Sequence, residues 1–166
     1  MTTRILVPAS ARPLVGRALV TAGATLALML ASRMIDTPIL GGQLPGTKIA
    51  VAVHVTAAVT AVPLGGYVLW ARKGDARHKA LGRIWAGMMM VIALSSLWLR
   101  SISGGFSFIH LFSILTLVSI PLAIFYARRG RVRDHVYTVR GLYIGLVVAG
   151  FFSFIPGRLL GGLLFG

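Results

Sequence analysis

A stretch of about 30 residues occurs twice in this chain, and this repeat limits the possible folds more than any other feature. The copies run from His54 to Arg83 and from His110 to Arg140. All four histidines lie inside them, 24 positions apart in the first copy and 25 in the second. Of 21 aligned positions, six are identical: His54/His110, Thr60/Thr116, Val62/Val118, Ala71/Ala127, Arg72/Arg128 and Gly74/Gly130. A fixed internal period of this kind predicts two structural units of one type.

The composition favours a membrane protein. The 166 residues are 57% hydrophobic with a mean hydropathy of +0.86, and only 12% are charged, against about 25% in soluble domains. The net charge of +14 would suggest nucleic acid in a soluble protein, but long apolar runs with basic breaks argue against that partner. There is no cysteine, which excludes disulfides, thiolate metal sites and covalently attached c-type haem. Any cofactor must therefore be held by histidine or by burial.

Five apolar runs are each near the roughly 20 residues that cross a bilayer. They span residues 14–32, 48–71, 80–99, 106–127 and 135–154, and the first is expected to remain uncleaved. We predict an all-α integral membrane protein of five transmembrane helices, the last four forming a duplicated two-helix repeat. The predicted divisions are 1–47 (N-terminus, first helix and outer loop), 48–155 (the duplicated core, copies about 48–104 and 105–155) and 156–166 (an interfacial tail).

The basic residues predict how the chain crosses the membrane. In this topology 13 lysines and arginines fall on one side, and four, Arg33, Lys48, Arg100 and Arg158, fall on the other. Because positive residues stay in the cytoplasm, the N-terminus is expected inside and the C-terminus outside.

The repeat also predicts how the histidines pair. His54 and His110 lie near the outer ends of their helices, and His78 and His135 lie at the inner starts of theirs. Copies of the same topology are related by a pseudo-twofold axis along the membrane normal. We therefore expect His54 to face His110 and His78 to face His135, in an outer and an inner layer.

Two opposed imidazoles are too few donors for zinc, but they are enough for haem iron, which needs only axial ligands from the protein. We therefore predict a four-helix haem-binding bundle with two b haems, in which His54/His110 and His78/His135 are the axial iron ligands. On the His54 face the residues one turn apart are small, which would leave room for a ring: Ala57, Ala58, Ala61 and Gly65. The cations expected near the haem propionates are Lys79, Arg83 and Arg140 at the inner pair and Arg100 at the outer pair.

Two other interpretations stay open. In one, the protein is a haem-free carrier or accessory subunit whose paired histidines handle protons or substrate. In the other, only the outer pair binds haem. A quinol is a candidate electron donor, and a homodimer or larger membrane complex is compatible with the sequence.

Several motifs resemble a bacterial family of predicted membrane proteins, domain of unknown function 2306. They are His54, His78 with Arg83, then GGFSFIH, ARRGRVRDH and FIPGRLLGG, over about residues 50 to 162. The resemblance implies the inner (plasma) membrane of a bacterium. The layout also resembles the cytochrome b-561 family, whose four central helices hold two b haems between histidines of alternate helices. That resemblance implies a transmembrane oxidoreductase carrying electrons between the two faces.

Overall fold

The computed structural model describes residues 45–98 and 108–153, and residues 14, 17–18, 21–26, 29 and 32 of the first apolar run. The first predicted span is thus described only in part. Arg100 and the predicted tail lie outside the described residues.

Four helices form the described core: α2 (Pro45–Trp70), α3 (Ala76–Trp98), α5 (Phe108–Arg128) and α6 (Val132–Phe152). Each is long and apolar enough to cross a bilayer. This confirms an all-helical, multi-pass membrane protein, with four candidate spans among the described residues.

Three of the helices, α2, α3 and α6, begin earlier than the apolar runs predict. α3 starts at Ala76 rather than residue 80, and α6 at Val132 rather than His135. At α3 the carboxylate of Asp75 accepts the backbone N–H of His78 (2.7 Å), which satisfies one of the free donors of the first turn. Hydropathy locates the apolar centre of a span. At α3 the Asp75 cap sets the start, whereas Arg131 makes no side-chain cap bond at the start of α6. The predicted basic loops therefore shorten to residues 71–75 and 129–131.

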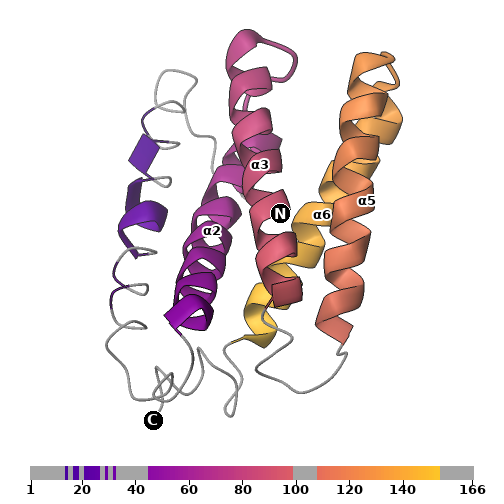
Figure 1. Cartoon of the computed structure of the whole chain (residues 1–166). Coiled ribbons are helices and arrows are strands. Elements are labelled where there is room, and N and C mark those ends of the chain that lie inside the picture. Colours follow the sequence, from indigo (N-terminus) through magenta and orange to yellow (C-terminus); the bar gives the residue numbers. More distant parts are fainter. Residues whose placement is uncertain are drawn as a thin grey trace, which may run out of the picture.

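The helices are arranged as two hairpins that run in the same direction (Figure 1). α2 packs on α3, α3 on α5, α5 on α6, and α6 on α2, so α2 lies diagonal to α5 and α3 diagonal to α6. We call the end with residues 71–75 and 129–131 the turn end, and the opposite end the open end.

The turns repeat as well as the helices. Gly74 (φ 87°) and Gly130 (φ 69°) are aligned in the repeat, and both adopt the left-handed conformation that glycine tolerates without steric cost. The segment from Gly130 to His135 is one residue longer than the segment from Gly74 to His78. The difference in histidine spacing between the copies therefore lies next to the turn.

Equivalent positions of the two copies fill the same core. Residues are equivalent at a separation of 56 in α2 and α5, and of 57 in α3 and α6, as the histidine pairs set it. Six of the eight members of the central cluster form such pairs: Leu64/Ile120, Trp85/Leu142 and Met89/Leu146. The duplication read from polar residues is therefore also a duplication of buried positions.

Candidate functional site

His54 lies on α2 near the open end, with its ring half-buried against α3. Its Nδ1 is 3.1 Å from the carbonyl oxygen of Ile92 and 3.0 Å from Ser95 Oγ. Since a carbonyl can only accept, Nδ1 carries the proton and Nε2 keeps its lone pair. The Ser95 hydroxyl donates to the Val91 carbonyl (2.7 Å), which leaves its oxygen free to accept from His54.

His110 lies at the same end, in the first turn of α5, and is only 4% exposed. One turn further, Ser113 Oγ donates to Ser96 Oγ on α3 (2.8 Å), and both serines are buried. The open end thus holds buried polar side chains from α3 and α5, together with His54 from α2. His54 and His110 thus share this end on diagonal helices.

His135 lies in the first turn of α6 at the turn end. Its Nδ1 donates to the carbonyl of Ala123 on α5 (2.9 Å), so Nε2 again keeps its lone pair. His135 and His54 therefore have the same tautomer although they lie in opposite layers.

His78, in the first turn of α3, is half-buried and lies within electrostatic reach of His135, across the diagonal of the bundle. Its Nδ1 is fully buried and has no hydrogen-bond partner among the described residues. A buried polar atom without a partner is uncommon in folded proteins and calls for an explanation, such as an ion or ligand. His78 and His135 thus lie at the same end of the bundle, and the His78 ring also approaches the backbone of Val68 on α2.

The small face of α2 does not stay open along its whole length. Trp85 Nε1 donates to the carbonyl of Ala61 (3.1 Å). A Cβ added at Gly65 would clash with that Nε1 and lie 2.8 Å from the Tyr143 ring. An indole and a phenol from α3 and α6 therefore fill the space beside Ala61 and Gly65, between the two histidine layers. Only Ala57 and Ala58 remain small neighbours of His54.

Three of the four predicted cations are described, and all three are exposed at the turn end: Lys79, Arg83 and Arg140. Arg83 and Arg140 each follow their histidine by five residues, which is roughly 140° around a helix of 3.6 residues per turn. They therefore lie nearly opposite the histidine rings, and Arg83 Nε donates to the Lys79 carbonyl (3.2 Å). Their role toward propionates stays a prediction, as does that of Arg100, outside the described residues.

The sequence did not single out Ser95 and Ser96, which contact His54 and Ser113. Their signal is that they are adjacent hydroxyls in an otherwise apolar part of a span. Within the described ranges, no group of three histidine or acidic side chains could hold a metal ion. Each of the helices α2, α3, α5 and α6 carries one histidine, and two of these imidazoles lie at each end of the bundle.

The comparisons with known proteins agree with the helical, apolar character of the chain. The family described as "Predicted membrane protein (DUF2306)" matches residues 51–161, which include both copies of the repeat. No curated protein and no solved structure matches. The match extends over more than half of the sequence, and the chain belongs to this family of predicted membrane proteins.

Proposed function

We propose that the protein is a b-type cytochrome that carries electrons across the membrane, with one haem between His54 and His110 and a second between His78 and His135. The observation that carries the proposal is the placement of all four histidines. They occupy equivalent positions on four helices, two at each end of the bundle, and each layer spans a diagonal.

The state of the imidazoles supports this function. His54 and His135 donate Nδ1–H to backbone carbonyls, which is how metal-ligating histidines are commonly held, with Nε2 left for the metal. The buried Nδ1 of His78 is a further nitrogen without a partner in the described part of the chain. The donor chemistry therefore fits haem iron, which needs only axial ligands from the protein.

When bound, haem supplies a one-electron couple whose potential depends on ligands, burial and nearby hydrogen bonds. The chain contributes ligand orientation: the Ile92 and Ala123 carbonyls fix two rings and raise their basicity. The central cluster around Trp85 separates the layers and keeps water from the middle of the bundle. The ring of His78 approaches the backbone of Val68, 14 residues beyond His54, so the layers are roughly 21 Å apart along α2.

The test is the visible spectrum of the purified full chain, with iron counted per chain. We expect b-type bands after reduction with dithionite and about two irons per chain, each held by two axial histidines. His54→Ala or His135→Ala is expected to remove one of the two haem signals. Thr60→Ala is the control, because Thr60 is also identical in the repeat but only donates to the Thr56 carbonyl. Stable, colourless, haem-free protein would reject the cytochrome and favour proton or substrate handling by the histidines.

A further inference from the structure

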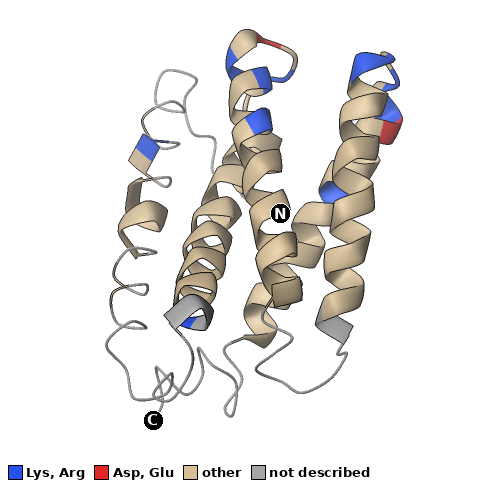
Figure 2. Cartoon of the chain, in the orientation of Figure 1, with Lys and Arg blue, Asp and Glu red and all other residues tan. Residues whose placement is uncertain are grey.

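Positive charge is concentrated at the turn end (Figure 2). Of the lysines and arginines on residues 45–98 and 108–153, Lys48 alone lies at the open end. Ten lie at or near the turn end: Arg72, Lys73, Arg77, Lys79, Arg83, Arg128, Arg129, Arg131, Arg133 and Arg140. All ten are exposed, so the charge forms a rim around the ends of the helices.

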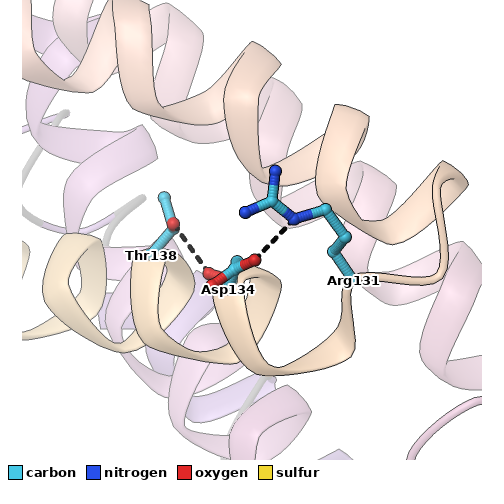
Figure 3. Close-up of polar contacts among 3 residues, drawn as sticks. All are labelled: Arg131, Asp134 and Thr138. Carbon is cyan, nitrogen blue, oxygen red and sulfur yellow. Dashed lines mark hydrogen bonds and ion pairs between the residues drawn. The ribbon is translucent and has the colours of Figure 1, made fainter.

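The described residues do little to neutralise this rim. Its two carboxylates are Asp75 and Asp134. Asp134 pairs with Arg131 Nε (2.7 Å) and accepts the Thr138 hydroxyl at its backbone carbonyl (2.8 Å; Figure 3). Asp75 accepts the His78 backbone N–H. Like charges closer than the Debye length of about 8–10 Å repel one another, so this end attracts anions from its surroundings.

Aromatic rings support several of these guanidinium groups. Arg77 lies over Tyr67 (5.6 Å), Arg129 over Phe125 (5.2 Å) and Arg131 over Tyr126 (4.7 Å). A stacked guanidinium keeps its N–H edge available for bidentate bonds to phosphate, although at Arg131 the Asp134 carboxylate takes part of that edge. Aromatic rings at helix ends lie at the level of the lipid headgroups.

We infer that the rim at the turn end binds the phosphodiester headgroups of anionic phospholipids in the adjoining leaflet. Depth favours lipid over a soluble anion. Arg83 and Arg140 lie seven and eight residues inside α3 and α6, roughly 10–12 Å from the helix starts, on faces that point away from the bundle. Where these faces meet the bilayer, lipid reaches them and a soluble anion does not, and long basic side chains extend from there to the headgroups.

The test measures the association of spin-labelled phosphatidylglycerol and phosphatidylcholine with the full chain in vesicles, by electron paramagnetic resonance. The wild type is expected to prefer phosphatidylglycerol. Arg77→Gln/Arg129→Gln/Arg133→Gln is expected to lower that preference by at least about fivefold, the effect of one cation near a charged surface. Lys48→Gln, the matched control at the open end, is expected to leave it unchanged.

A second measurement needs no variant. Raising the ionic strength from about 0.05 M to 0.5 M shortens the screening length several-fold and is expected to reduce the wild-type preference. Equal association of the two lipids with the wild type, or an equal loss in Lys48→Gln, would overturn the inference. Neither readout depends on haem. A colourless protein that still prefers the anionic lipid would therefore refute the cytochrome but support lipid binding by the rim at the turn end.

Discussion

The two hairpins share their geometry but not their packing. Each has a left-handed glycine in its turn, a histidine in the first turn of its second helix, and buried residues at equivalent positions. They differ in the size of side chains at equivalent positions: Trp85 and Gly65 in the first hairpin correspond to Leu142 and Pro121 in the second.

This difference is a consequence of packing around one axis. Trp85 and Leu142 belong to the same central cluster, in which the indole occupies the space beside Ala61 and Gly65. One copy therefore holds a large residue and the other a smaller one. The comparison teaches that the chain retains the turn glycines and the histidine positions in both hairpins, while the residues that meet in the interior differ in size.

The strongest test of the comparison asks whether haem pairs across the copies. His54→Ala/His78→Ala takes one ligand from each proposed pair and is expected to abolish the haem absorbance. His54→Ala/His110→Ala empties one layer and is expected to leave about half, because the other pair of axial ligands is intact. The reduced spectrum and iron content of purified protein measure both. If the first double variant kept half of its haem, pairing across copies would be wrong.

Substitutions at Trp85 and Leu142 test whether equivalent core positions contribute unequally to stability. Trp85→Ala is expected to reduce the free energy of unfolding by about 3–5 kcal/mol because it leaves a large cavity. Leu142→Ala should cost about 1 kcal/mol less, since only Trp85 also loses a hydrogen bond, to the Ala61 carbonyl. Unfolding in mixed detergent and dodecyl sulfate gives both values. Ile84→Ala, at an exposed position of α3, is the control and should change little.

A substitution at Gly65 tests the close contact of this glycine with the Trp85 and Tyr143 rings, at a position where the second hairpin has Pro121. Gly65→Ala places a Cβ against the Trp85 indole and the Tyr143 ring and is expected to destabilise by about 1–3 kcal/mol, as overpacking does. At Gly87 an added Cβ meets no atom within 4 Å. Gly87→Ala should therefore stabilise α3 by up to about 1 kcal/mol through helix propensity. Thermal unfolding measures both variants. If the unfolding midpoints of Gly65→Ala and Gly87→Ala shifted in the same direction, the proposed difference in packing at the two glycines would be wrong.

The smallest effect is expected where the hairpins are alike. An added Cβ has open space at both Gly74 and Gly130, so alanine there tests the backbone conformation alone. Each substitution is expected to cost about 1 kcal/mol, the penalty of a left-handed backbone for a residue with a Cβ. Both should cost the same within error, and asparagine should cost less than alanine. A large difference between the two positions would show that the turns are not equivalent.

The sequence predicted the last four spans and the layer in which each histidine lies, because apolar runs and repeated polar residues are local signals. It misplaced the starts of α3 and α6, since Asp75 and the charged first turns extend the helices beyond their apolar centres. It also predicted an open face along Ala61 and Gly65, which Trp85 and Tyr143 occupy. No spacing within α2 could reveal that filling, because it comes from other helices.

The pairing of buried positions across the hairpins has a consequence for how such a chain can arise. One hairpin alone exposes the residues that its counterpart covers, but two identical hairpins side by side would bury them against each other. A half-length ancestor could therefore have functioned as a homodimer, and fusing its genes would have freed each half to specialise.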